Sequence, residues 1–269
     1  MDASRTTDLL EETLRATIAV GQPLSDEEWE LPTDCPGWTV KDHVSHLIGT
    51  ERMLQGLPLS EIELTPSAHV KNPIGEFNER EVEKRRGQSG AQVLGELEEL
   101  VDLRLNTLRN ADDAYFAQEA MTPTGPGTML DFLSIRILDC WVHEQDIRRA
   151  VGQPGHLDGG PAEHTTDRLL RTLPIVVGKR AGAPEGSLTL MHITGPVERT
   201  VPVLVEEGRA KVVDPDPAGT PDVTVSMDSE TFLVLAVGRH SAADRADRIE
   251  ISGEGGWGQA VVDQLNMMI

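Results

Sequence analysis

Aromatic side chains and cysteines are scarce in this chain of 269 residues, which has four Trp, four Phe, one Tyr and two cysteines. Leu, Val, Ile and Ala must therefore supply most of the core packing. The two cysteines, Cys35 and Cys140, cannot build a disulfide framework. The chain has no run of roughly 18 apolar residues that could span a bilayer, and its N-terminus lacks the pattern of a signal peptide. We therefore expect a cytoplasmic protein.

Basic residues are also few compared with acidic ones. The chain has 24 Lys and Arg and 45 Asp and Glu, which gives a formal net charge of −21 at pH 7. This excess would repel the phosphates of nucleic acids and the surface of an anionic membrane. The charge therefore argues against nucleic acid and membrane as partners. The length suggests two domains or one large one, with cores that need no disulfides.

The first half of the chain has the hydrophobic spacing of long helices. Thr39 and Asp42 form a variant of the capping box at the start of the second helix. Gly152 and Pro154 end the fourth. Helices are predicted over residues 8–20, 40–55, 91–108 and 129–151. Four helices of these lengths predict a four-helix bundle, which we assign to residues 1–153.

The connections between these helices are rich in Pro, Gly and polar residues. Such composition predicts loops at residues 21–37, 56–75 and 110–127. Residues 76–86 are expected to add a helical turn of their own.

The second half, residues 154–269, alternates short segments rich in Val, Leu, Ile and Thr with segments of helical pattern. Strands are predicted over residues 187–194, 198–206, 208–214, 222–227 and 248–253, and helices over 162–177, 228–237 and 256–267. Strands flanked by helices predict an α+β domain on a mostly antiparallel sheet. The fold class of the whole chain is therefore predicted as α+β.

The most informative chemistry lies on the fourth predicted helix. Asp139 and His143 are four residues apart and so share one face, and Asp146 lies on the same side three residues further on. A carboxylate and an imidazole in this spacing can chelate a divalent metal ion, with one or two histidines from another helix completing the site. The alternative is a structural hydrogen-bonded pair, or an exposed pair, with no metal.

The second predicted helix offers two histidines, His43 and His46. Helix geometry slightly favours His43 as the more buried, because it lies closer to the apolar stripe of Val40, Val44 and Leu47. Periodicity does not decide which of the two histidines could be a metal ligand. Both could also be ordinary surface or half-buried histidines.

Two motifs, PGWTVKDHVSHLIG and DCWVHEQDIRRAVGQP, resemble signatures of the mycothiol-dependent maleylpyruvate isomerase family. The late segment from Pro221 to Asn266 is similar to the C-terminal domain of that family, so the resemblance covers nearly the whole chain. It implies a DinB-like metal-binding four-helix bundle at the N-terminus. It also implies a small α+β domain related to sterol carriers at the C-terminus, residues 154–269.

The resemblance also implies the metal ligands. The metal triad of the family is a histidine near the middle of helix two, with an acid and a histidine four residues apart on helix four. Carried over to this chain, the ligands are His46, Asp139 and His143, so the resemblance selects His46 over His43. The acid is usually Glu in the family, and Asp139 is shorter by one methylene group.

Two further residues receive roles from the resemblance. Asp146 matches a recurrent HxxD position, and we expect it to act in catalysis by orienting His143 or an arginine. A place on the helix surface is its alternative. Arg239 matches an arginine of the C-terminal domain that is implicated in catalysis and in binding substrate or thiol, since a guanidinium suits a carboxylate. A surface arginine near a helix end is the alternative for Arg239.

The resemblance implies a metal- and mycothiol-dependent enzyme, either a cis–trans isomerase or a thiol S-transferase. Its cofactor would be a divalent metal, Zn²⁺ before others, with mycothiol as co-substrate. Its partners would be a small-molecule thiol and an electrophilic substrate, and we expect a monomer or a homodimer. A thiolate stabilised at neutral pH by the metal would attack the electrophile. The alternative is a non-catalytic zinc-binding protein that regulates or that binds a ligand.

Overall fold

The computed structural model describes residues 1–214 and 219–267. The chain divides into two compact units, Met1–His156 and Leu157–Ile269, which we describe one at a time. None of the helices in the described residues is both long enough and apolar enough to cross a membrane.

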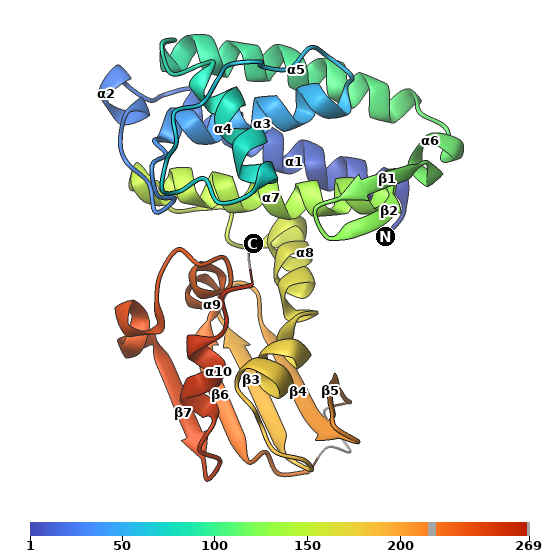
Figure 1. Ribbon diagram of the computed structural model, residues 1–269, viewed down its shortest axis with the longest axis vertical. Helices are drawn as coiled ribbons and strands as arrows, with labels where there is room; N and C mark the ends of the chain where they lie inside the picture. Colours follow the sequence, from blue (N-terminus) through green and yellow to red (C-terminus); the bar gives the residue numbers. More distant parts are fainter. Residues whose placement is uncertain (215–218, 268–269) are drawn as a thin grey trace. The chain divides into compact units, whose positions relative to one another are not determined.

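Four long helices form the N-terminal unit: α1 (Ala3–Gly21), α3 (Val40–Leu54), α5 (Gly90–Asn110) and α7 (Met129–Ala150). They run alongside one another in Figure 1, with α1 packed on α5 and α7, and α3 packed on the same two helices. Their facing side chains form one buried apolar core, which includes Leu10, Leu14, Leu47, Leu97 and Ile137. The predicted four-helix bundle is therefore confirmed.

Capping explains where two of the long helices begin. The side chain of Asp2 accepts a hydrogen bond from the backbone N–H of Arg5 at 2.8 Å, so α1 starts five residues before the predicted position. At the start of α3, the backbone N–H of Thr39 donates to the carboxylate of Asp42 at 2.9 Å. This bond fixes the first turn of the helix that carries both histidines.

The connections hold more structure than predicted, and the prediction of plain loops at 21–37 and 110–127 was wrong. They contain two short helices, α2 (Asp26–Trp29) and α6 (Asp113–Ala117), and an antiparallel hairpin of β1 (Glu119–Thr122) and β2 (Gly125–Thr128). Gly125 has a φ of 114°, which glycine adopts easily, so the chain can turn tightly between the two strands. The Pro and Gly residues of this segment had instead suggested an irregular loop. The extra helix α4 (Pro73–Glu83) starts three residues early because Asn72 caps it.

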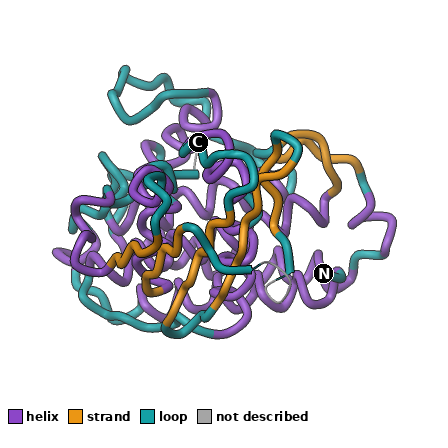
Figure 2. The backbone as a smooth tube through the Cα atoms, turned by 90° about the horizontal axis from the view of Figure 1, so that it is seen from below, coloured by secondary structure: helices purple, strands orange, loops and turns teal. Residues whose placement is uncertain are grey.

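The C-terminal unit is built on a five-stranded sheet in the order β5–β4–β3–β6–β7. Its strands are β3 (Leu188–Thr194), β4 (Arg199–Glu206), β5 (Arg209–Val212), β6 (Val223–Asp228) and β7 (Ile249–Gly253). Among the strands of the described residues, β3 and β6 alone pair in parallel, so the predicted mostly antiparallel sheet is confirmed. Figure 2 colours the backbone by secondary structure, and its strands belong to this sheet and to the hairpin β1–β2.

Helices pack on this sheet as an α+β fold requires. Helix α9 (Ser229–Ala236) contacts β3 and β6, and α10 (Gly258–Asp263) contacts β6 and β7. The helix predicted over 162–177 is interrupted in the structure: α8 (Gly159–Leu170) ends before Pro174, and a short π-helix (Ile175–Arg180) follows. The last helix is also shorter than predicted. A 3-10 helix, Ala242–Arg248, precedes β7.

The N-terminal unit ends in a histidine that ties its last residues to the bundle. The ring Nδ1 of His156 lies 2.8 Å from a carboxylate oxygen of buried Glu144, and Nε2 lies 3.3 Å from Glu12. Its carbonyl accepts a hydrogen bond from Trp141 Nε1 at 2.9 Å. The hydrogen bond to Glu144 raises the pKa of His156 above its ordinary value, against the opposing effect of burial.

This raised pKa predicts a pH-dependent stability. The stabilisation by His156 is complete below the pKa of an unfolded histidine and is lost as the pH rises through the folded pKa. We expect His156→Asn, which tolerates the φ of 54° at this position, to cost about 1 kcal/mol at pH 6 and less at pH 9. Urea unfolding followed by tryptophan fluorescence measures this, with His192→Asn in β3 as the control. An equal cost at both pH values would contradict the prediction.

Candidate metal centre

Five polar side chains meet inside the bundle where α3 packs on α7. His43 and His46 come from α3, and Asp139, His143 and Asp146 come from α7. Four of them are buried, and the side chain of Asp139 is 20% exposed. The structure thus brings together residues that are about 100 positions apart in the sequence.

The first group of three is His46, Asp139 and His143, the set that the family resemblance implies. His46 Nε2 lies 3.0 Å from one carboxylate oxygen of Asp139, and His143 Nε2 lies 3.5 Å from the other. Ligands about 2.1 Å from a tetrahedral zinc ion lie about 3.4 Å from one another. Each imidazole nitrogen therefore lies at about the spacing of two ligands from one oxygen of Asp139, and the shorter side chain reaches both imidazoles.

Two members of this group, His46 and Asp139, have protonation states that suit a metal. Burial lowers the pKa of His46, so its imidazole is neutral at pH 7. Burial acts to raise the pKa of Asp139, but the charge of Arg136 outweighs this effect and holds that pKa well below its usual range. Metal ions bind neutral imidazole and ionised carboxylate, which are the forms expected of His46 and Asp139. Against the opposing effect of burial, Asp139 and Asp146 raise the pKa of His143, so a cation that binds there displaces a proton from its ring.

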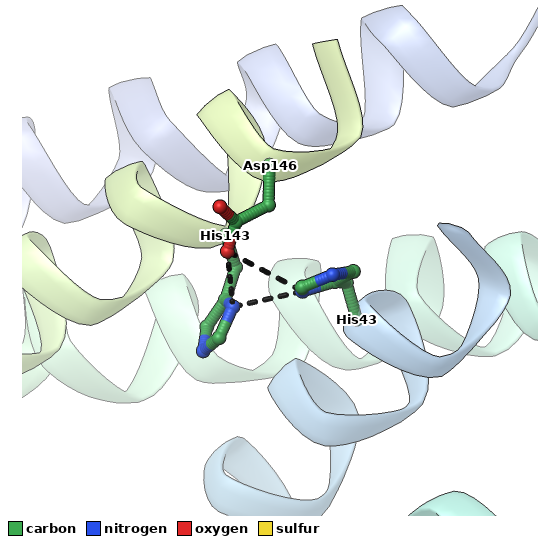
Figure 3. Close-up of side chains that lie close together, drawn as sticks. All are labelled: His43, His143 and Asp146. Carbon is green, nitrogen blue, oxygen red and sulfur yellow. Dashed lines mark hydrogen bonds and ion pairs between the residues drawn. The ribbon is translucent and has the colours of Figure 1, made fainter. Parts of the chain in front are cut away.

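A second group of three shares His143 with the first. His143 Nδ1 lies 2.8 Å from His43 Nδ1 and 3.3 Å from Asp146 Oδ2, and His43 Nδ1 lies 3.9 Å from the same oxygen. Figure 3 shows these contacts and the other ring nitrogen of His143, which points away from both partners. The two nitrogens of His143 thus serve different groups.

Asp146 is held by more than His143. Arg149 donates a hydrogen bond to the other oxygen of Asp146, and Arg149 Nε donates to Asp34 Oδ2 at 2.8 Å. The carboxylate of Asp146 is fully buried. It therefore contacts both kinds of partner that the sequence suggested, a histidine and an arginine.

Charged residues that sequence reasoning missed support the acid of the first group. Arg136 donates a hydrogen bond to Asp139, and its Nε donates to Glu51 at 2.9 Å. Arg104 Nε donates to the other oxygen of Glu51 at 3.1 Å. The three charged side chains that support Asp139 are all buried: Glu51, Arg104 and Arg136. The spacing of three residues between Arg136 and Asp139 was a signal in the sequence, but Glu51 and Arg104 carried none.

Trp38 forms a wall of the site. Its ring centroid lies 5.3 to 5.7 Å from those of three imidazoles, His43, His46 and His143. Its Nε1 donates to Glu79 at 3.0 Å, which fixes the indole in place. The tryptophan of the PGW motif therefore covers the histidines with an apolar surface.

The two cysteines differ in environment. Cys140 is fully buried in the core of the bundle, and burial raises the pKa of its thiol. A thiol in that state is a poor nucleophile. Cys35 is half-buried in the loop before α3.

Arg239 lies in the C-terminal unit, just after α9. It lines a cavity of about 500 Å³ together with His240, Ser241 and Asn266. Its Nη1 donates to the carbonyl of Val237 at 3.3 Å. The structure therefore puts this arginine at a cavity of its own unit.

Comparisons with known proteins agree with this architecture. A family model of the mycothiol maleylpyruvate isomerase N-terminal domain matches residues 10–148, and one of the SCP-2 sterol transfer family matches residues 180–265. The predicted sterol-carrier-like α+β domain is thereby confirmed. No curated protein matches the chain.

Two solved structures are similar over 94% of this chain and 93% of their own. They are the mycothiol-dependent maleylpyruvate isomerase, with a TM-score of 0.56, and a histidine-to-alanine mutant of it, with a TM-score of 0.58. Each is 18% identical to this chain in sequence. At this identity the likeness shows a shared fold.

Proposed function

Since the chain belongs to the mycothiol maleylpyruvate isomerase N-terminal domain family, we propose that it is a metal- and mycothiol-dependent enzyme acting on an electrophilic small molecule. The observation that carries this proposal is the group of His46, Asp139 and His143, whose ligand atoms lie within 4.8 Å of one another. These three residues would hold a divalent ion, zinc before others. The reaction is a cis–trans isomerisation or a transfer of the thiol.

With His46, Asp139 and His143 as its protein ligands, the ion would keep one position for a further ligand, as in catalytic rather than structural zinc sites. When bound, the ion would supply a positive charge that stabilises the thiolate of mycothiol at neutral pH. In an isomerase, this thiolate would add to a conjugated double bond of the substrate and turn it into a single bond that can rotate, and elimination would return the other isomer and the thiolate. In a transferase, the thiol would stay on the product.

The other residues of the chain prepare this site. Asp146 accepts a hydrogen bond from His143 Nδ1 and so orients its ring, as carboxylates do for metal-binding histidines. Trp38 excludes water from one side of the imidazoles. We assign Arg239, on the cavity of the C-terminal unit, to binding a carboxylate of the substrate or of the thiol.

A closed zinc site in a regulatory or ligand-binding protein is the second candidate. It would need a fourth ligand from the chain, and His43 is the nearest further histidine. However, His43 bonds to Nδ1 of His143, on the opposite side of the ring from Nε2. This geometry supports an open position and so favours the enzyme.

The test combines metal analysis with an assay of mycothiol consumption over a panel of electrophiles. We expect about one equivalent of metal per chain and turnover that needs both metal and mycothiol. Protein treated with a chelator is the control and should be inactive until metal is restored. Bound metal without thiol consumption would favour the regulatory protein, and absence of metal after incubation with zinc would remove the site.

A further inference from the structure

The two groups of possible ligands cannot use His143 in the same way. A neutral imidazole has one nitrogen with a proton and one with a free lone pair, and only the second binds a metal. The group of His46 and Asp139 needs the lone pair on Nε2, whereas the group of His43 and Asp146 needs it on Nδ1. The position of one proton on His143 therefore decides where a cation binds.

Thr33 is the first residue of a chain of hydrogen bonds that ends at this proton of His143. Its hydroxyl donates to the carbonyl of Trp38 at 3.0 Å, and a carbonyl can only accept. Its oxygen also accepts from the backbone N–H of Cys35 at 3.2 Å. Because the only proton of the hydroxyl is used, Thr33 must accept from His43 Nε2, which lies 2.8 Å away.

His43 passes this constraint on to His143. It is fully buried, where an imidazolium is costly, so a proton on Nε2 leaves a lone pair on Nδ1. That lone pair faces His143 Nδ1 at 2.8 Å and needs a donor there. Asp146 Oδ2, at 3.3 Å from the same nitrogen, is an acceptor as well. Two acceptors on one side of the ring place a proton of His143 on Nδ1. Asp139 Oδ1 lies 3.5 Å from Nε2, and against the opposing effect of burial Asp139 and Asp146 together raise the pKa of His143. When the ring loses its second proton, the two acceptors keep the remaining one on Nδ1 and leave the lone pair on Nε2.

We propose that Thr33 and His43 are positioning residues that fix His143 as its Nδ1–H tautomer, which directs Nε2 and the cation to His46 and Asp139. This rests on the proposed function, because it concerns the same metal centre. It assigns a role to His43, which helix periodicity could not distinguish from His46 as a possible metal ligand. His43 is a partner of a ligand, and the group that contains Asp146 is a hydrogen-bonded support and not a second metal site.

The tautomer can be measured directly by ¹⁵N NMR of the histidine rings in the metal-free, full-length protein. At a pH high enough to make His143 neutral, we expect its signal to show a proton on Nδ1 and none on Nε2. At that pH, a proton on Nε2 with none on Nδ1 would overturn the inference. The measurement needs no bound metal, so it tests the tautomer even if the proposed function fails.

Metal affinity gives the second readout. His43→Leu and Thr33→Val each break the chain with little change in volume, and we expect them to weaken zinc binding about 10-fold in a chelator competition. His43→Asn keeps an acceptor close to the place of Nδ1 and should bind within about 3-fold of the wild type. Circular dichroism checks that each variant is folded, and a misfolded variant leaves the NMR result to decide.

Two results in this competition would overturn the proposal. If His43→Leu bound zinc as tightly as the wild type, the hydrogen-bond chain through His43 would have no effect on the affinity of the site for zinc. Loss of zinc from a His43 variant, with zinc retained by His46→Ala, would put the cation among His43, His143 and Asp146. A wild type that binds no zinc at all refutes the proposed function instead, and this outcome is distinguishable from the other two.

Discussion

His46→Ala and His143→Ala should each weaken metal binding by about 100-fold or more. Zinc held by four ligands in a small domain gains about 10–16 kcal/mol, so one ligand accounts for about 3 kcal/mol, or about 100-fold. Both histidines lie inside the bundle, on α3 and α7, and alanine is a strong helix former. The helices should therefore persist while the metal is lost.

Metal content after dialysis, together with far-ultraviolet circular dichroism, measures the two parts of this expectation. His192→Ala in β3 is the matched control, since it removes a histidine from the other unit. The control should keep its metal. If both variants of the bundle retain one equivalent, the ligand assignment is wrong.

The helix spacing alone was enough to put Asp139 and His143 on one face, and the structure has them together. It could not choose between His43 and His46. The reason is that every residue of α3 from Val40 to Glu51 is buried, so this helix has no solvent face from which a hydrophobic pattern could be read. The family resemblance supplied what periodicity could not.

Local sequence patterns could not predict contacts between residues that are far apart in the sequence. Glu51 meets Arg136 across 85 positions, and Thr33 meets His43 from a loop whose path no periodicity describes. The hairpin β1–β2 was missed for a related reason, since Gly and Pro mark a turn but do not say whether its flanks pair. Sequence patterns predicted the elements, and tertiary packing decided what surrounds each ligand.

Asp139 is shorter by one methylene group than the glutamate that the family resemblance implies for this position. Asp139 nevertheless directs its two oxygens to different imidazoles, at 3.0 and 3.5 Å. Arg136 donates to one of these oxygens and is itself held by Glu51. The hydrogen bond from Arg136 therefore holds the short carboxylate of Asp139 in position. Because Glu51 holds Arg136 in turn, the position of Asp139 depends on the buried charged residues of the bundle.

We expect Glu51→Gln to destabilise the N-terminal unit by about 3–5 kcal/mol. Glu51 is the acidic partner of both Arg104 and Arg136, and all three side chains are buried. A neutral amide leaves two guanidinium groups without this charge partner. Arg104 is the more sensitive of the two, because its Nη2 already has no hydrogen-bond partner within the residues that the structure describes.

Urea unfolding of the metal-free protein, followed by tryptophan fluorescence, measures this loss without a contribution from bound metal. Three of the four tryptophans, Trp29, Trp38 and Trp141, lie in the N-terminal unit, so the signal reports mainly on the bundle. Asp102→Asn is the control, because it breaks an exposed ion pair with Arg15 and should cost at most about 1 kcal/mol. A cost for Glu51→Gln as small as that of the control would mean that the arginines find other partners. Asp139 would then owe its position to the helix alone.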